Sequence, residues 1–459
     1  MKRRHHAPRS LALPIAVLAL ALGLVAGAGT QPGSASRWAV HDLRLSEART
    51  LAPDMPAATR SARSSAAWCG TARQTDQSPN AVAGNPVHWI YAIPSDGPDG
   101  FSTWASAMQA DAESIDAWWR ASDSTRTFRS DLAQFACGQQ VDISMIRLNQ
   151  SGGQLASVDT RFGRIADALV ALQFSSNFTK YVVYYDGPVE PEICGQGGSL
   201  RSGLGFAIVY PRACAGVPLN TTVAHEVLHT MGAVADGAPH MCAAPDDGHV
   251  CDDPHDMMYP YGDDTPITGL TLDTGRDDYY GHTGAWADTQ DSPWLVQLDR
   301  QAPLALAITG PGSVSADVPG LQCAQACTTT WNAGTELGLT ATPARGAKLV
   351  RWSDGCSGAA GCEVVVGQAP RVSALFAPST YRLVVSVKGQ GSVGSSQGGL
   401  ACPPRCSRPV PSYQTVRLTP RPAKGWRFRS WSGACRGTTP VCRVAMTANT
   451  TARALFARR

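Results

Sequence analysis

Two histidines four residues apart, His225 and His229, have the spacing in this sequence that points most directly to chemistry. Positions four apart on an α-helix share one face, with Cβ atoms about 5–6 Å apart, so both imidazoles can bind one metal ion. Glu226 follows the first histidine, where its carboxylate can reach a water beside the metal without binding the metal itself. Gly232 permits the left-handed turn that ends many helices. The stretch predicts half of a catalytic zinc site, with Glu226 as general base.

A third protein ligand must come from elsewhere, because catalytic zinc is usually held by three side chains and keeps one position open. In the motif HExxHxxGxxH the third histidine follows the glycine by three residues, but Ala235 stands there in this chain. Downstream candidates are Asp236, His240, His249 and His255. Spacing alone leaves the choice among them open.

The zinc helix and the downstream run from Gly248 to Tyr259 together resemble secreted bacterial metzincin-like zinc peptidases. In that group a long, disulfide-pinned loop separates the helix from a His-Cys-rich stretch and a Met-x-Tyr turn. The resemblance covers residues 68–300. It implies His249 as third zinc ligand, with His240 as the alternate and Asp236 ranked third.

The same resemblance implies roles for the residues of the turn. Met257 would form a hydrophobic floor under the imidazoles, with Met258 as an alternative register, and Tyr259 would approach the metal or the oxyanion. The implied activity is that of a secreted zinc endopeptidase, in which a zinc-activated water attacks a peptide carbonyl and Glu226 accepts its proton. Two alternatives stay open: a surface or cell-wall binding protein with a degenerate zinc domain, and a zinc hydrolase of a non-protein amide.

Calcium is a further candidate ligand, because aspartates gather around the predicted turn and hard oxygen ligands suit that ion. No EF-hand spacing is present, and a solvated acidic surface explains such a cluster equally well. The residues concerned are Asp246, Asp247, Asp252, Asp253, Asp263, Asp264, Asp273, Asp277 and Asp278.

The elements that must position this site follow from hydrophobic periodicity. Alternating or continuous apolar runs predict strands over 87–94, 141–148, 181–185 and 205–210, and helical spacing predicts helices over 106–120 and 162–174. We therefore expect an α+β fold, with a twisted mixed sheet and the active-site helix in one zinc metallopeptidase domain over 68–300.

The N-terminus is typical of an exported protein. Residues 1–28 combine early basic residues, an apolar run and an Ala-x-Ala site, and predict a signal peptide. Residues 29–67 are rich in Ala, Arg, Ser and Pro and are interpreted as a leader or propeptide. No later segment is apolar enough to span a membrane. We expect a secreted, extracellular protein.

Cysteine usage supports an oxidising compartment, because all 14 cysteines follow the predicted signal peptide. The six in the predicted catalytic domain allow about fifteen pairings. Our choice among them is Cys194–Cys214, Cys69–Cys137 and Cys242–Cys251.

The C-terminal part repeats itself. Cys323, Cys327, Trp352 and Cys356 recur 79 residues later, and Cys362 recurs at a shift of 80. This self-similarity predicts two small all-β domains, 301–379 and 380–459, each held by two local disulfides. A zinc ribbon is the alternative use of such paired cysteines. The copies resemble divergent β repeat domains at the ends of secreted bacterial hydrolases and surface proteins.

Charge is divided unevenly along the chain. Residues 29–300 hold 17 Lys and Arg against 32 Asp and Glu, whereas residues 380–459 hold 14 Lys and Arg and no acidic residue. A surface of that sign attracts polyanions, so we expect repeat 2 to attach to an anionic cell-wall or other extracellular polymer, unless it is only a soluble spacer. Nucleic acid is disfavoured because no nucleic-acid motif accompanies the charge. The other expected partner is a protein or peptide substrate.

Overall fold

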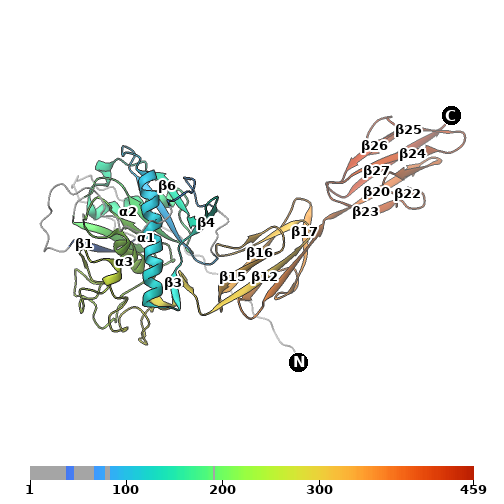
Figure 1. Cartoon of the computed structure of the whole chain (residues 1–459). Helices are drawn as coiled ribbons and strands as arrows, with labels where there is room; N and C mark the ends of the chain where they lie inside the picture. Colours follow the sequence, from blue (N-terminus) through green and yellow to red (C-terminus); the bar gives the residue numbers. More distant parts are fainter. Residues whose placement is uncertain (1–37, 46–66, 78–82, 190–191, 215) are drawn as a thin grey trace, which may run out of the picture. The chain divides into compact units, whose positions relative to one another are not determined.

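The computed structural model describes residues 38–45, 67–77, 83–189, 192–214 and 216–459, so the predicted signal peptide lies outside the described residues. Its N-terminal part is built on a seven-stranded sheet with the order β10-β1-β8-β9-β7-β2-β6 (Figure 1). The strands are β1 (Ala39–Leu45), β2 (Val87–Ile93), β6 (Ile143–Arg147), β7 (Lys180–Tyr185), β8 (Ile193–Ser199), β9 (Gly205–Val209) and β10 (Tyr261–Gly262).

Strand β2 shows why the centre of this sheet forms. All seven of its residues are buried, and it pairs in parallel with β6 on one side and β7 on the other. Its side chains alternate between two cores: Trp89 and Tyr91 belong to one hydrophobic cluster, and Ile90 and Ala92 to the other. A strand covered on both faces needs a nearly continuous apolar run, which Val87–Ile93 supplies apart from His88.

Helices cover both faces. Helix α1 (Phe101–Ser122) and helix α3 (Leu219–Met231) contribute Ile115 and Val227 to the cluster that contains Trp89. Helix α2 (Val158–Ala171) contributes Phe162 to the cluster that contains Ile90. These helices and strands confirm the coarse expectation of mixed α and β structure.

Three strands of this sheet, β1, β8 and β10, were not predicted. Strand β8 pairs antiparallel with β9, and β1 pairs antiparallel with β8. Residues 39–45 lie inside the range interpreted as a leader or propeptide, and they form a strand of the sheet outside the expected limits 68–300. The interpretation of the range as a leader or propeptide stays a prediction. The sequence analysis did not identify β1 because its partner strand β8 lies about 150 residues away and nothing local indicates the pairing.

Smaller elements complete this part of the chain. Strands β3 (Arg126–Phe128) and β11 (Leu295–Gln297) form one pair, and β4 (Leu132–Phe135) and β5 (Gly138–Val141) form a hairpin. Short 3-10 helices lie at Gly152–Leu155, Ile267–Gly269 and Thr289–Asp291. The disulfides Cys69–Cys137, Cys194–Cys214 and Cys242–Cys251 are all present, which confirms the predicted pairing.

Each C-terminal repeat consists of two four-stranded sheets (Figure 1). The strands of repeat 1 are β12 (Gln301–Thr309), β13 (Gly312–Ala316), β14 (Gln322–Cys323), β15 (Cys327–Asn332), β16 (Glu336–Pro343), β17 (Ala347–Asp354), β18 (Cys362–Val365) and β19 (Arg371–Pro378). Those of repeat 2 are β20 (Thr380–Lys388), β21 (Gly391–Ser395), β22 (Ala401–Cys402), β23 (Ser407–Pro411), β24 (Thr415–Pro422), β25 (Trp426–Gly433), β26 (Cys442–Ala445) and β27 (Thr450–Arg458).

The two repeats have the same topology and the same arrangement of disulfides. The strand order β15-β12-β19-β17 in repeat 1 corresponds to β23-β20-β27-β25 in repeat 2. The four predicted disulfides, Cys323–Cys327, Cys356–Cys362, Cys402–Cys406 and Cys435–Cys442, are formed, so the zinc-ribbon alternative is wrong. Among the described helices, none is long and apolar enough to cross a membrane.

Candidate metal centre

Helix α3 carries the predicted metal-binding pair. Its residues from Thr221 to Thr230 are all buried, and it ends at Gly232, whose φ of 91° lies in the left-handed region. The Gly232 amide donates to the carbonyl of His229 at 3.1 Å. The glycine therefore ends the helix directly after the second histidine, as the sequence indicates.

Strand β8 lets this helix lie unusually close to the sheet. A Cβ on Gly195 would come within 2.6 Å of Glu226 Oε1, and one on Gly197 within 2.6 Å of the Glu226 carbonyl oxygen and 2.7 Å of His229 Cβ. Any side chain at either position would push the helix away. The glycines thus set the distance between α3 and the sheet. This role was not predicted.

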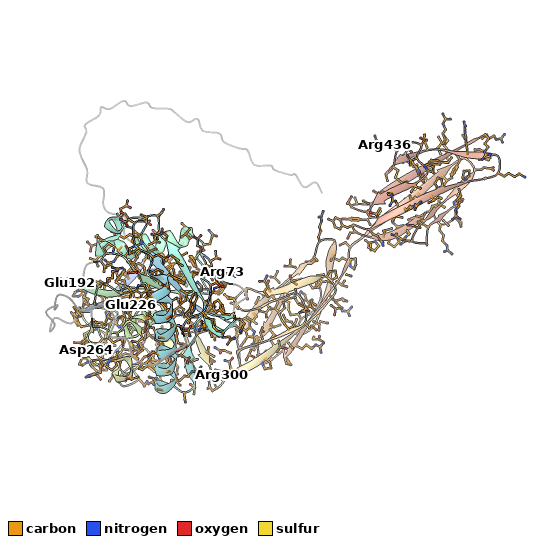
Figure 2. The ribbon with its side chains drawn as sticks, turned by 45° about the horizontal axis from the view of Figure 1, so that its top comes forward. Arg73, Glu192, Glu226, Asp264, Arg300 and Arg436 are labelled. Carbon is orange, nitrogen blue, oxygen red and sulfur yellow. A yellow bond between two sulfur atoms is a disulfide. The ribbon has the colours of Figure 1, made fainter. Side chains whose placement is uncertain are left out.

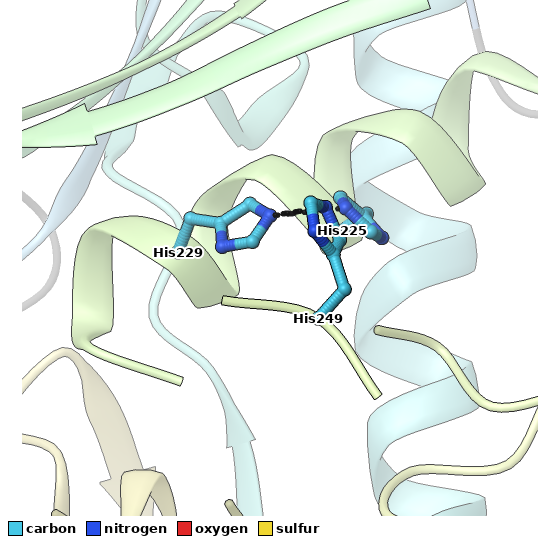
Figure 3. A group of neighbouring side chains, drawn as sticks. All are labelled: His225, His229 and His249. Atoms are coloured by element: carbon cyan, nitrogen blue, oxygen red, sulfur yellow. Dashed lines mark hydrogen bonds between the residues drawn. The ribbon is translucent and has the colours of Figure 1, made fainter. Parts of the chain in front are cut away.

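Three imidazoles converge beside α3 (Figure 3). The Nε2 atom of His229 lies 3.1 Å from Nε2 of His225 and 3.2 Å from Nε2 of His249. Zinc–nitrogen bonds of about 2.0–2.1 Å in a tetrahedral arrangement put ligand nitrogens roughly 3.3 Å apart. The spacing of these nitrogens therefore fits a single zinc ion.

Hydrogen bonding on the far side of two rings fixes which nitrogens face the centre as acceptors. His225 Nδ1 lies 2.7 Å from the Met257 carbonyl oxygen, and His249 Nδ1 lies 3.0 Å from the Asp246 carbonyl oxygen. Both carbonyls can only accept, so each Nδ1 carries the proton and each Nε2 presents a lone pair. His229 has one ring proton to donate if it is neutral, and cannot satisfy both lone pairs. A bound cation satisfies them.

Burial keeps these rings neutral. Desolvation lowers the pKa of His225 and His229 well below the usual histidine value and lowers that of His249 to about 4. Repulsion from the neighbouring imidazoles acts in the same direction for the two helical histidines. Neutral imidazole is the form that binds a metal ion.

The loop after α3 is held in a conformation that places His249 beside the two helical histidines. The disulfide Cys242–Cys251 closes a short loop around it, and the Cys242 amide donates to the His249 carbonyl oxygen at 2.8 Å. The Val250 amide donates to the Met258 carbonyl oxygen at 3.0 Å, which ties this loop to the turn. Met257 is itself buried, and its carbonyl orients His225.

Glu226 lies next to this cluster and is wholly buried between α3 and the sheet. Its Oε1 accepts a hydrogen bond from the Leu43 amide of β1 at 3.3 Å. Burial, with a contribution from the charge of Asp42, raises the pKa of Glu226 well above its ordinary value. A carboxylate with raised proton affinity beside three neutral imidazoles is suited to accepting and returning a proton.

The other candidate ligands lie elsewhere. His240 Nδ1 is 3.0 Å from Asp278 Oδ2 and groups with Asp252 and Asp278 rather than with the helical pair. Asp236 is exposed, and His255, with 63% of its side chain exposed, lies beside Asp253. Of the third-ligand candidates, the structure brings only His249 to His225 and His229.

The sequence predicts a catalytic role for Tyr259 and calcium binding by the acidic cluster. The Tyr259 ring is half-buried and packs against Tyr261, with ring centroids 5.9 Å apart, and no hydrogen bond to the three histidines is found within the described ranges. Asp273, Asp277 and Asp278 lie close enough to share a cation, but acidic groups often gather without one. A catalytic role for Tyr259 and calcium binding both stay predictions.

One neighbour of the three histidines was not predicted. The His41 ring, from β1, stacks on the His229 ring with centroids 4.8 Å apart, and its Nδ1 lies 3.0 Å from the Asp247 carbonyl oxygen. Nothing local in the sequence around His41 signals this contact, because it depends on the pairing of β1 with β8.

Comparison with known proteins identifies the C-terminal part. The family model of the divergent InlB B-repeat domain matches residues 309–380 and 385–459, one match in each repeat. The predicted duplication of a divergent β repeat is thereby confirmed. Repeats of this bacterial kind, together with the disulfides, are consistent with an extracellular protein.

Other comparisons find only distant similarity. A search of curated proteins finds no match. The Bacillus anthracis TIE protein is similar over 35% of this chain and 34% of its own, at 9% identity and a TM-score of 0.23, so this chain spans about a third of its length. The major pilin protein T-13 from Streptococcus pyogenes is similar over 35% of this chain and 96% of its own, at 8% identity and a TM-score of 0.17.

Proposed function

We propose that the chain is a secreted, metzincin-like zinc endopeptidase whose ligands are His225, His229 and His249. The observation that carries the proposal is the convergence of three neutral imidazole nitrogens, 3.1 and 3.2 Å apart, beside a buried glutamate. Two helical histidines with one loop histidine leave the fourth position of a tetrahedral ion open, which is the arrangement of catalytic zinc.

In the proposed hydrolysis, the zinc ion and the side chains have different roles. A zinc ion bound there acts as a Lewis acid toward the carbonyl of the substrate and toward the attacking water. Glu226 accepts the proton of that water and returns it to the nitrogen of the departing amine. His225 is held for this work by the Met257 carbonyl, and His249 by the Asp246 carbonyl.

The test is metal-dependent proteolysis by the full chain. Purified protein should hydrolyse casein, lose activity when a chelator removes its metal, and regain activity when zinc is added back. Protein that holds zinc but leaves casein and peptide panels intact would contradict the proposal and favour the hydrolase of a non-protein amide.

We propose as a second function that repeat 2 binds an anionic polymer. Exposed arginines lie on both of its sheets, for example Arg427 of β25 and Arg417 of β24, and Arg436, labelled in Figure 2, is exposed in the loop between β25 and β26. Arg417 of β24 lies directly opposite Arg443 of β26, and both are exposed. Like charges facing each other across strands destabilise a sheet, and a bound polyanion would relieve that repulsion.

A further inference from the structure

Strand β1 lies between β8 and the two-residue edge strand β10, and it covers β8 beside helix α3. It runs antiparallel to β8 from the pair Ala39↔Ser199 to Arg44↔Ile193, with an irregularity between Leu43 and Arg44. Without β1, β8 would be an edge strand beside α3, with free backbone groups. Such an edge binds an extended peptide through main-chain hydrogen bonds.

The register of β1 brings one of its peptide bonds to the candidate general base. Glu226 must reach the nitrogen of a departing amine to return a proton to it, and hydrogen-bond distance sets that reach. Within β1, the nitrogen that lies within its reach is that of Leu43, 3.3 Å from Glu226 Oε1. The Asp42–Leu43 bond therefore lies where a substrate bond would lie.

A second contact of β1 crowds the histidines. The His41 ring stacks on His229 and lies edge-on to His249, with centroids 4.8 and 6.1 Å away. A Cβ on Gly248 would come within 2.4 Å of the His41 ring, so the ring is seated tightly against the ligand loop. Space that a substrate carbonyl would need beside the ligands is thus filled by His41.

Both ends of the strand are anchored. Trp38 packs edge-on against Phe162 and Phe206, with ring centroids 5.8 and 5.5 Å away. The Leu43 side chain is 2% exposed, in the same apolar cluster as Val217. A segment tethered to its own binding site competes at an effective concentration far above that of most substrates.

We infer that residues 38–45 occupy the peptide-binding groove in a substrate-like register, and that the chain hydrolyses protein slowly until this strand is displaced. The inference rests on the proposed peptidase function. It assigns the groove to the β8 edge, and it gives residues 38–45 the role of an internal inhibitor.

The experiment uses the full-length chain with a recognition sequence for a sequence-specific protease inserted between Ala57 and Ala58. After cutting and size-exclusion chromatography, casein hydrolysis should rise at least about tenfold, consistent with removal of a tethered competitor. A fluorescent peptide with the sequence of residues 37–46 should bind the cut protein at least about tenfold more tightly than the uncut protein. The unlabelled peptide should restore inhibition, and a peptide with alanine at positions 41 and 43 should not.

A second variant covers the case in which the cut strand stays bound. The substitutions His41→Ala and Leu43→Ala, made together in the uncut chain, should raise casein hydrolysis and peptide binding. His255→Ala is the matched control, because that histidine is exposed and lies outside the centre. Circular dichroism checks that each variant is folded.

The outcomes separate the two proposals. Equal peptide binding and equal hydrolysis in the original, cut and doubly substituted proteins would overturn the inhibitory role of β1 while leaving a peptidase intact. Peptide binding that rises after displacement, with no hydrolysis by any zinc-loaded form, would support occupancy of the groove and reject the peptidase function.

Discussion

Three histidines and one glutamate define the candidate centre at the scale of single residues. His225, Glu226 and His229 follow from helical geometry, and His249 follows from the family resemblance. The structure brings the three histidines together, and Glu226 is buried on the same helix as two of them. His41 and the Leu43 amide could not be predicted, because the pairing of β1 with β8 is long-range and brings Leu43 to Glu226, 183 residues further along the chain. Local sequence thus predicts the helical pair of histidines but not His249, and it misses the segment that covers the candidate centre.

Replacing Glu226 with glutamine should separate metal binding from catalysis. The amide keeps the size of the side chain but cannot accept a proton, so hydrolysis by the displaced form should fall at least about 100-fold. The zinc content should stay at the original level, since Glu226 is not one of the three proposed ligands. Casein assays and metal analysis on the same preparation check both parts, and undiminished hydrolysis would remove Glu226 from its assigned role.

At the scale of elements, the close approach of α3 to β8 is the feature that positions the centre. The strand sequence Ile-Cys-Gly-Gln-Gly-Gly-Ser carries little apolar periodicity, so β8 escaped prediction, whereas β2, β7 and β9 are apolar enough to be recognised. Its glycines serve packing against the helix rather than strand propensity. Pattern-based reasoning fails at such a strand because its role depends on a tertiary contact.

The substitution Gly197→Ala tests this packing. Its methyl group would meet Glu226 backbone and the His229 side chain, so the helix must shift. We expect the free energy of unfolding to fall by about 1–3 kcal/mol, which is the usual cost of adding a group to a well-packed core. We also expect weaker zinc binding, because the helix carries two of the proposed ligands. Gly153→Ala is the matched control, because a Cβ there meets nothing within 4 Å. Denaturant unfolding of both variants measures the difference, and equal stability would show that the approach is not constrained.

A pH-dependent contribution to stability is expected where α1 packs on β7. The Tyr184 hydroxyl donates to Asp111 Oδ2 at 2.8 Å, and burial raises the pKa of Asp111 to about 7. Because the folded-state pKa exceeds the unfolded value of about 3.9, the folded state binds more protons between these values, and stability falls as pH rises through that range. The limiting slope is about 1.4 kcal/mol per pH unit.

Asp111→Asn should remove this contribution. The amide oxygen can still accept from Tyr184 and does not ionise, so the variant should be more stable than the original chain at pH 7 and nearly equal to it at pH 4. Thermal unfolding across that range gives the comparison, and parallel curves for the two proteins would rule out a buried ionisation at this site.

At the scale of the whole chain, an acidic part with the candidate metal centre is joined to a β repeat of no net charge and to a second, strongly basic β repeat. The repeats were recognised from the sequence because duplicated cysteines and tryptophans make their own pattern, and their topology and disulfides agree with it. Their partner does not follow from fold. Only the charge of repeat 2, with 14 Lys and Arg and no acidic residue, indicates a class of partner, an anionic polymer.

Neutralising three arginines of repeat 2 tests the role of this charge. The triple variant Arg417→Gln, Arg421→Gln, Arg443→Gln should elute from an immobilised anionic polymer at lower salt, because exposed charges act through screened attraction. The control neutralises Lys348, Arg351 and Arg371 of repeat 1, which are also exposed. Identical elution of the two triple variants would show that binding depends on net charge and not on repeat 2.

The most direct test of the whole account is the zinc content of the full-length protein, measured by mass spectrometry after dialysis against metal-free buffer. We expect about one zinc per chain in the original protein and in His240→Ala, and a large loss in His249→Ala, since catalytic zinc needs three protein ligands. An original protein without zinc, or a His249→Ala variant that keeps it while His240→Ala loses it, would contradict the assigned centre.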